Sequence, residues 1–371
     1  MSAVDPHIVH ILATAALESV PLELAGAMSR SDRARVSVVV VRPSATPPEV
    51  RNIVVQSRVG QLPTTLRRLR PDVVHVHHGV VAFLGALSAR LVGVPLIVKT
   101  EHRDRYTYGL LRRVLNMATL VLCDVIICNS ESTKRTFARL EQWLLRQPVL
   151  VIYNGVDIDR IDRAPRADAP WHGRWPNGIP VLGIVARLVP YKDHATLFRA
   201  IATLKARHVR VGCAVIGDGP LRHELAALVE QLQLNDAVTF VGRLPDRDAV
   251  YSALHCLDLF VIPSRSSEGF CNAAVEAMAA NLPVIAARGG ALPEVTGGCA
   301  VLVPVHDPVP LADAIERTLA ERPTGQSGPT AGRQRACELY SLTAAVERHL
   351  STYATYDRRR RLRRSYVTPA S

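Results

Sequence analysis

The chain has 371 residues, 48% of them apolar, so we expect two domains that each bury a core of their own and not a disordered polymer. Its seven cysteines are dispersed without a C-x-x-C pair, which argues against a disulfide framework or a structural zinc site and favours a reducing compartment. The net charge of +12 points to an anionic partner, and solubility is the other explanation. Because no apolar run approaches roughly 18 residues and the first residues lack a basic stretch, we expect neither a membrane-spanning helix nor an export signal.

Along the first half of the chain, short β-branched runs alternate with amphipathic segments. Apolar strands that are separated by helices indicate a parallel sheet that is covered on both faces. The expected strands are residues 7–12, 36–41, 73–76, 96–100, 125–128 and 149–152, and the expected helices are residues 62–69, 81–91 and 132–143.

Residues 155–180 interrupt this alternation with prolines, glycines and charges, which predicts an interdomain linker. The alternation then resumes, so the sequence predicts an α/β protein of two Rossmann-like, doubly wound parallel-sheet domains that face a cleft. The expected strands are residues 181–185, 211–216, 238–241, 259–262, 283–286 and 300–303, and the expected helices are residues 194–206, 221–231, 272–280, 311–319 and 343–356.

The strongest motif is Glu268-Gly-Phe-Cys-Asn-Ala-Ala-Val-Glu276, which lies between an expected strand and an expected helix. The backbone N–H groups of Gly269, Phe270 and Cys271 at the helix start could bind phosphate or sugar oxygens. Glu276, inside the helix, could accept hydrogen bonds from ribose hydroxyls. The alternative is a solvated surface helix with two incidental acids, since two glutamates eight residues apart mean little alone.

A second motif begins at Gly183, inside the first expected strand of the second half, and ends with Lys192. Arg187 and Lys192 follow that strand, where a guanidinium and an ammonium could bind a diphosphate and stabilise it as it leaves. We therefore count Gly183, Arg187 and Lys192 among the donor-binding residues. The alternative is one salt-bridged arginine and one solvated lysine.

These motifs resemble those of the retaining glycosyltransferases of family four (glycosyl transferases group 1), which have the GT-B fold. Their order and spacing match that family's Glu-x7-Glu and its Arg and Lys pair. The resemblance is dense in the second half and looser in the first. It extends to Asn154-Gly155-Val156-Asp157, Gly217-Asp218-Gly219-Pro220, Phe240-Val241-Gly242, and Gly289-Gly290 with Pro293-Glu294.

The resemblance implies that Glu268 contacts the donor sugar, that Glu276 binds the ribose, and that Arg187 and Lys192 hold the diphosphate of a nucleotide sugar. It also implies retention of the anomeric configuration, by attack on the face that the nucleotide leaves. The diphosphate would then take the acceptor's proton, which would explain why no glycosidase-like acid/base pair is evident. Thr100-Glu101-His102 resembles the family's Thr-x-His, so His102 would lie near the reacting sugar.

From this resemblance we expect a hexosyltransferase that acts on a lipid-linked or polysaccharide acceptor, in the synthesis of a cell-envelope glycan or a glycolipid. The expected domains are residues 1–153 on the acceptor side, a hinge at 154–180, a nucleotide-sugar domain at 181–340, a helix at 341–356 that returns to the first domain, and a basic tail at 357–371. A nucleotide-sugar epimerase of related fold is the alternative among enzymes, although it would need catalytic acids from both halves.

Two local features bear on these expectations. Where the family usually has a Gly-Gly loop, this chain has Ala15 and Ala16, whose methyl groups would crowd a ligand. That departure supports a further alternative, a non-catalytic scaffold that binds sugar nucleotides. The sequences Asp157-Ile-Asp159 and Asp246-Arg-Asp248 have the D-x-D pattern of metal-dependent transferases, but their positions favour helix caps and turns, so we expect no metal and no other cofactor.

Three histidines, His75, His77 and His78, follow one another at the end of an expected strand. Three imidazoles suggest a metal, but no cysteine or carboxylate lies at ligand spacing near them. We therefore favour polar groups on the acceptor side or loop residues.

The positive charge is concentrated in residues 1–150, which hold 19 Lys and Arg against 11 Asp and Glu, and in the tail. The tail could bind an anionic membrane surface or could be a solvated end, and nothing around it suggests nucleic acid. We expect a cytoplasmic protein that is able to bind peripherally to the inner face of the cell membrane. The tail arginines are Arg358, Arg359, Arg360, Arg361, Arg363 and Arg364.

Overall fold

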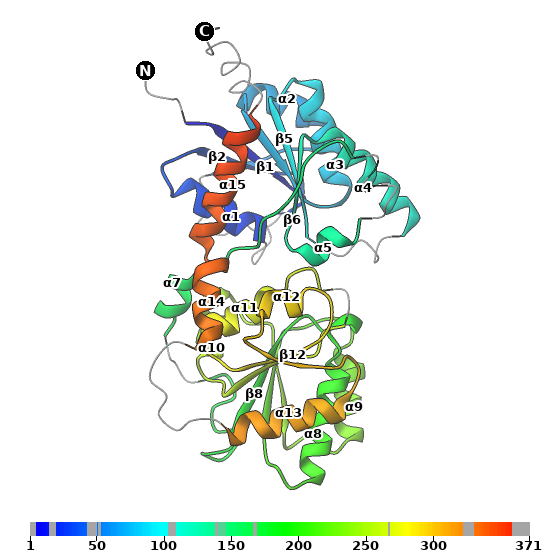
Figure 1. Ribbon diagram of the computed structural model, residues 1–371, viewed down its shortest axis with the longest axis vertical. Coiled ribbons are helices and arrows are strands. Elements are labelled where there is room, and N and C mark those ends of the chain that lie inside the picture. The colour runs from blue at the N-terminus through cyan, green and yellow to red at the C-terminus, as the bar shows by residue number, and fades with distance from the viewer. Residues whose placement is uncertain are drawn as a thin grey trace, which may run out of the picture. The chain divides into compact units, whose positions relative to one another are not determined.

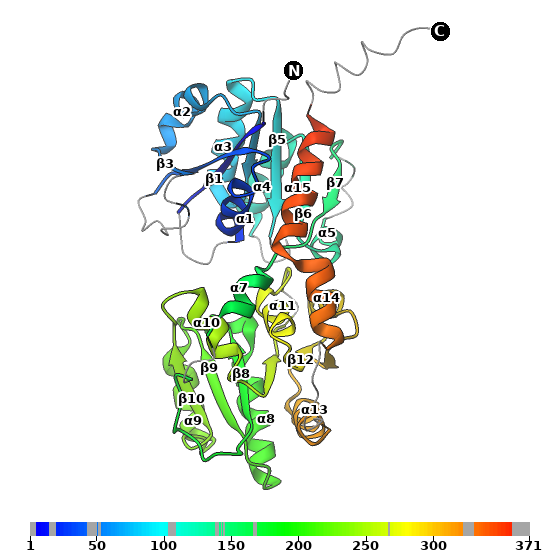
Figure 2. The same cartoon turned by 90° about the vertical axis from the view of Figure 1, so that its left-hand side faces the viewer.

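A computed structural model describes residues 5–14, 20–42, 50, 53–102, 109–137, 141, 143, 145–165, 169–265, 268–321 and 330–357. The chain divides into two compact units, Met1–Gly155 with Leu342–Ser371, and Val156–Ser341. Each unit is a parallel sheet with helices on both faces (Figures 1 and 2). Ala15, Ala16 and the arginines of the tail lie outside the described residues.

The strands of the first unit are β1 (His7–Leu12), β2 (Arg35–Val40), β3 (Val54–Gln56), β4 (Val73–Val76), β5 (Leu96–Glu101), β6 (Val125–Cys128) and β7 (Val149–Val151). Among the described residues they form one parallel sheet in the order β3-β2-β1-β4-β5-β6-β7. Side chains of a strand alternate between faces, so Ile8 and Val9 enter two different cores. Both faces are therefore buried, as parallel sheets require.

Helices cover the two faces of this first sheet (Figure 2). The core that contains Ile8 is closed by α1 (Val20–Ser29) and α15 (Leu342–Tyr356), which pack against each other. The core that contains Val9 is closed by α2 (Leu62–Leu69) and α3 (Gly79–Leu91). The unit also contains η2 (Val59–Gln61), α4 (Leu110–Leu122), which packs on α3, and α5 (Glu131–Arg135).

The strands of the second unit are β8 (Val181–Val185), β9 (Gly212–Ile216), β10 (Val238–Gly242), β11 (Leu259–Ile262), β12 (Val284–Ala287) and β13 (Val301–Val303). They pair in parallel in the order β10-β9-β8-β11-β12-β13. This order reverses direction between β8 and β11, which makes their carboxyl ends the topological switch point at which such sheets bind ligands.

One face of the second sheet is closed by α8 (His194–Ala206), α9 (Arg222–Gln231) and α13 (Pro308–Ala320), which share a core with the strands. The remaining helices are α7 (Ile158–Arg163), η4 (Pro190–Lys192), α10 (Arg247–Leu254), α11 (Asn272–Ala279), α12 (Leu292–Thr296) and α14 (Ala331–Tyr340). None of the helices in the described ranges combines the length and the apolar character that crossing a lipid bilayer requires.

The predicted fold class, two Rossmann-like parallel-sheet domains, is confirmed, and most expected strands and helices lie within two residues of the observed ones. The helix expected over 132–143 is interrupted: α5 (Glu131–Arg135) ends at Arg135, Thr136 and Phe137 are not helical, and Glu141 and Trp143 are helical again. There the Thr136 hydroxyl donates a 2.6 Å hydrogen bond to the carbonyl of Thr133, a local bond that competes with the helix. The expected linker at 155–180 contains α7, whose first turn is capped by Asp157.

Candidate functional site

Two loops at the switch point of the second sheet carry the predicted donor residues. Arg187 and Lys192 follow β8, and Glu268 follows β11, the strand that pairs with β8. The loops meet because the two strands are neighbours in the sheet, although more than 70 residues separate them in sequence. The second unit therefore gathers cations and a carboxylate where a doubly wound sheet binds its ligand.

Lys192 and Glu268 form a buried ion pair in this unit. The Nζ atom of Lys192 lies 2.6 Å from Oε2 of Glu268, and each side chain is only 11% exposed. Burial alone would lower the pKa of Lys192, but the neighbouring carboxylate of Glu268 outweighs it, and the net shift is upward. Lys192 is therefore held as an ammonium, the form that can bind a phosphate.

Glycines bring the loop backbones of this site into close contact. A Cβ atom on Gly217, whose φ is +131°, would lie 2.0 Å from the carbonyl oxygen of Ala186, next to Arg187. A Cβ atom on Gly290, whose φ is +54°, would lie 2.5 Å from the carbonyl oxygen of Glu268. Only glycine fits such approaches, so these residues fix the loops that present the arginine and the glutamate.

The start of α11 is tightly packed. Cys271, its N-cap, has a φ of 71°, a left-handed conformation that is uncommon for a residue with a side chain. Burial, with the charge of Glu268 nearby, raises the pKa of the Cys271 thiol to about 12, so the thiol stays protonated. Phe270 packs edge-on against Tyr340, with ring centroids 5.4 Å apart. The role of the backbone of Gly269, Phe270 and Cys271 in binding a ligand stays a prediction.

Glu276 lies inside α11 and pairs with an arginine that the sequence analysis did not identify. The Nη1 atom of Arg247 lies 2.6 Å from Oε1 of Glu276, and the glutamate side chain is 2% exposed. Arg247 is the first residue of α10 and stands between the two acids of the second D-x-D sequence. The D-x-D sequence was interpreted only through its two acids, although the arginine between them was visible in the same motif.

Arg187 and Gly183 differ in their surroundings. The guanidinium of Arg187 is exposed and makes no ion pair with any residue that the structure describes. Gly183 lies inside β8, where an added Cβ atom would meet the side chain of Leu257 at 2.1 Å. Packing against Leu257 explains this glycine on its own, and its part in donor binding stays a prediction.

The two D-x-D sequences act locally. The carboxylate of Asp157 accepts a hydrogen bond from the backbone N–H of Arg160, and that of Asp246 accepts one from Ala249. Asp248 pairs with Arg160 at 2.6 Å. These contacts confirm the interpretation of both sequences as helix caps.

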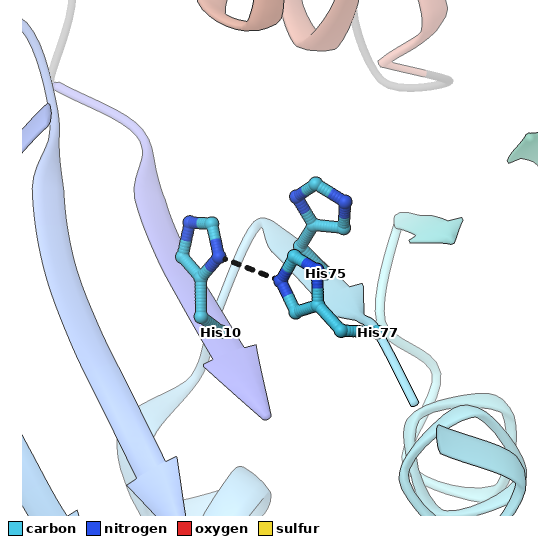
Figure 3. Close-up of side chains that lie close together, drawn as sticks. All are labelled: His10, His75 and His77. Atoms are coloured by element: carbon cyan, nitrogen blue, oxygen red, sulfur yellow. Dashed lines mark hydrogen bonds between the residues drawn. The ribbon is translucent and has the colours of Figure 1, made fainter. Parts of the chain in front are cut away.

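Histidines gather at the switch point of the first sheet, between β1 and β4. His10 lies on β1 directly opposite His75 on β4, and His77 follows β4. Figure 3 shows the rings of these three residues close together, with His10 and His77 joined by a hydrogen bond of 3.1 Å. Nitrogen atoms of the three rings lie within 4.8 Å of one another. His75 lies inside β4, so the loop alternative is wrong for it, whereas His77 lies in the loop after β4; both are buried.

His102 is connected to this cluster. Its Nε2 atom lies 3.2 Å from Nδ1 of His77. His77, Thr100, His102 and His349 line a pocket of the first unit. His10 and His349 could not be recognised in the sequence, because one histidine inside a strand or a helix gives no signal of its own.

Burial lowers the pKa of the clustered imidazoles and so keeps them neutral. For His10 it lowers the pKa to about 3, with a further contribution from His349. His349 itself is lowered to about 4. The pKa values of His75 and His77 also lie well below the usual range, first through burial and then through the other histidines.

The chain matches two family models. The model described as Glycosyl transferases group 1 matches residues 166–335, and the model described as Glycosyltransferase Family 4 matches residues 5–160. The first match contains the Lys192–Glu268 and Arg247–Glu276 pairs, and the second contains the histidine cluster.

Several curated proteins are similar to the chain. It is 30% identical over 312 residues to the D-inositol 3-phosphate glycosyltransferase of Mycolicibacterium smegmatis, covering 79% of this chain and 71% of the relative. It is 28% identical over 285 residues to the GDP-mannose-dependent alpha-(1-6)-phosphatidylinositol monomannoside mannosyltransferase of Mycobacterium tuberculosis, covering 72% and 73%. It spans 56% of the length of EpsF of Bacillus subtilis, with 30% identity over 228 residues.

Among solved structures, the chain is similar to Anabaena Alr3699/HepE in complex with UDP and glucose. The TM-score is 0.77 over 94% of this chain and 99% of that one, at 20% sequence identity. At this identity the likeness shows a shared fold.

Proposed function

As a member of the family-four glycosyltransferases (glycosyl transferases group 1), this chain is a glycosyltransferase, and we propose that it transfers a hexose from a nucleoside diphosphate with retention of configuration. The observation that carries the donor side of this proposal is the buried pair of Lys192 and Glu268 at the switch point of the second sheet. It supplies a fixed cation for phosphate and a fixed carboxylate for sugar hydroxyls at one place.

In this proposal Arg187 and Lys192 bind the diphosphate and neutralise the charge that it gains as it leaves. Glu268 binds the sugar, and Glu276, steadied by Arg247, accepts hydrogen bonds from the ribose. The backbone at Gly269, Phe270 and Cys271 adds donors at the start of α11. Because HepE of similar fold was solved with UDP and glucose, UDP-sugars are the first donors to test.

We further propose that the acceptor attacks the face that the nucleotide leaves and that the diphosphate takes its proton. His102, on the wall of the pocket in the first unit, would contact the reacting sugar. The transfer would need no metal ion, since two basic side chains carry the charge compensation and the first acids of the D-x-D sequences are engaged as helix caps.

We propose a lipid-linked acceptor, taken up by the protein while it is bound peripherally to the cytoplasmic face of a membrane. One of its relatives is named for a lipid, phosphatidylinositol monomannoside. Support from the structure comes from α4, where Leu111 and Val114 are 82% and 60% exposed and Val121 is also exposed. These positions fall on one side of the helix, and Arg112 and Arg113 flank them, a pattern typical of helices that bind anionic lipid surfaces.

A thermal-shift panel of nucleotide sugars and free nucleoside diphosphates tests the donor side. A ligand present at 100 times its dissociation constant adds about 2.7 kcal/mol to the free energy of unfolding. We expect stabilisation by the nucleotides of one base, and we expect Arg187→Ala to remove it. Stabilisation by none of them contradicts the proposal, and conversion of a bound nucleotide sugar into its epimer without an acceptor would favour the epimerase instead.

A further inference from the structure

We propose that His77, oriented by His10, is a positioning residue that holds the His102 ring in one tautomer, with its proton on Nδ1. The ring of His102 then offers its ligand a hydrogen-bond donor and no basic lone pair. This inference rests on the role proposed for His102 in the transfer reaction. Its test does not depend on that role.

The three rings form a continuous hydrogen-bonded chain. Nδ1 of His10 lies 3.1 Å from Nε2 of His77, and Nδ1 of His77 lies 3.2 Å from Nε2 of His102. The ring planes of His10 and His77 differ by only 8° and their centroids are 5.4 Å apart, so the rings lie end to end and an N–H of one can point at the lone pair of the other (dashed line in Figure 3). A neutral imidazole has one N–H and one lone pair, so each bond of the chain fixes the direction of the next.

The buried end of the chain sets that direction. Nε2 of His10 is inaccessible to water and has no hydrogen-bond partner among the described residues. A buried N–H without a partner is rarer in proteins than an acceptor without one. The Nε2 atom of His10 therefore carries the lone pair, and its Nδ1–H donates to His77.

The other two tautomers follow from the first. Nε2 of His77 accepts from His10, so the proton of His77 is on Nδ1 and is donated to Nε2 of His102. With its Nε2 lone pair engaged, His102 carries its proton on Nδ1. A cationic His102 would need the chain to run the other way and would leave His10 with a buried, unpaired N–H.

A shared metal ion would use the same nitrogens but conflicts with the contacts of His75. Its two ring nitrogens lie 2.7 Å from the hydroxyl of Tyr353 and 2.7 Å from that of Thr100. Its ring centroid is only 4.3 Å from that of His77, with the planes inclined by 32°. A cation held by His10, His75 and His77 would have to break one of the two hydroxyl contacts.

The chemical consequence concerns the reaction at the pocket. An imidazole whose lone pair is occupied by His77 cannot accept the proton of an acceptor hydroxyl. His102 then contributes by donating a hydrogen bond to a sugar or phosphate oxygen. The proton of the acceptor must leave by another group, such as the departing diphosphate.

Nitrogen NMR of the full-length protein with ¹⁵N-labelled histidine tests the hydrogen bonds between the three rings without any substrate. We expect His10, His77 and His102 each to carry the proton on Nδ1, and we expect ¹⁵N–¹⁵N couplings across both N–H···N bonds. In His77→Leu, the ratio of the Nδ1–H to the Nε2–H form of His102 should fall roughly fivefold, the effect of one lost hydrogen bond. In Tyr353→Phe, a control that removes a hydroxyl from the same cluster but not from the chain, the His102 ratio should not change.

The wild-type spectra are decisive even if the His77 variant does not fold. An Nε2–H tautomer of His102, or no coupling between the rings, overturns the proposal. So does binding of one equivalent of added Zn²⁺ that abolishes the couplings, which would make the cluster a metal site. Because the readout needs no sugar nucleotide, failure here leaves the donor proposal standing, and failure of nucleotide binding leaves the tautomers unaffected.

Discussion

Oε2 of Glu268 lies 2.6 Å from Nζ of Lys192, so the carboxylate proposed for the sugar and the ammonium proposed for the diphosphate already contact each other in this structure. The charge of each side chain offsets the free-energy cost of burying the charge of the other. The proposed donor binding and the stability of the fold are therefore coupled at this pair, whereas Arg187 is exposed and has no such coupling within the described residues.

The coupling predicts different outcomes for the two cations. Arg187→Ala should change the free energy of unfolding by no more than about 0.5 kcal/mol while lowering turnover about a hundredfold. Lys192→Ala should lower turnover as much but also cost roughly 3 kcal/mol or more of stability, because Glu268 would remain buried without its partner. Urea denaturation and initial rates, with the donor found in the thermal-shift panel, measure both effects.

A double variant serves as the control for this pair. Lys192→Ala combined with Glu268→Ala should recover part of the lost stability, since no buried charge remains unpaired, but none of the turnover. Near-normal rates in Arg187→Ala, or unchanged stability in Lys192→Ala, would show that the pair is not the donor site described here.

The two glutamates of the α11 motif should differ in ligand binding. Glu276→Ala should weaken free nucleoside diphosphate roughly 10- to 100-fold, the range for hydrogen bonds to a charged group. Glu268→Ala should act mainly on the nucleotide that carries its sugar. Isothermal titration calorimetry with both ligands separates the roles, and equal losses for both ligands in both variants would show that they are assigned wrongly.

The exposed side of α4 should control membrane binding. Leu111→Glu with Val114→Glu should reduce co-sedimentation with anionic vesicles, whereas Val309→Glu, an exposed apolar position in the second unit, should not. Arg112→Ala with Arg113→Ala should weaken the salt dependence, at about 1 kcal/mol per basic residue near the surface. Deletion of the residues after Tyr356 tests the arginine tail separately. Equal binding of every variant would remove the support for a membrane role.

Stability should fall steeply below neutral pH. Burial lowers the pKa of His10 to about 3 and the pKa values of His194 and His349 to about 4. The charge of Lys192 also lowers the pKa of His194. The folded protein keeps these rings neutral, while the unfolded chain binds protons below about 6.5, so their contribution is complete above that pH and is lost as the pH falls toward 4.

These three rings alone should give a slope of roughly 4 kcal/mol per pH unit between about pH 6 and pH 5, at about 1.4 kcal/mol per unit for each ring, and His75 and His77, whose pKa values are also lowered by burial, should steepen it further. Urea denaturation at a series of pH values measures it. His349→Gln should reduce the slope by the contribution of one ring. A free energy of unfolding that is constant from pH 7 to pH 5 would mean that these histidines are accessible to protons in the folded state.

The sequence predicted the strands and the longer helices of the second unit because their patterns are determined locally. The expected helix over 194–206 coincides with α8, and the glycine motifs at Gly217 and Gly290 proved to mark close approaches of backbone. The elements that were not predicted include α1, α4 and β3 of the first unit, where α1 and α4 are largely apolar and β3 is only three residues long. Their identity depends on the sheet against which they pack. Four helices of the second unit, α7, α10, α12 and α14, were not predicted either.

The contacts between side chains of different elements could not be predicted from the sequence. The ion pair of Glu276 needs a partner from α10, and the histidine chain needs residues from β1 and the ends of β4 and β5. Residues such as His10 and Arg247 come into position only when parallel strands align their carboxyl ends. The spacing of a motif predicts where a residue lies along one helix or strand, but it does not predict which helix or strand packs beside it.

The packing of α15 on the first sheet has a consequence for the order of events on the ribosome. Tyr353 contacts His75 across a separation of 278 residues, so the first unit lacks part of its core until the entire second unit has been synthesised. At 5–20 residues per second that interval lasts roughly 10 to 40 s. During it, the face of the sheet that α15 will cover is open and apolar. By the time α15 is made, the second unit has every strand it needs. The unit made last therefore completes its fold first, and the nascent first unit is the stage at which a chaperone would have the most to bind.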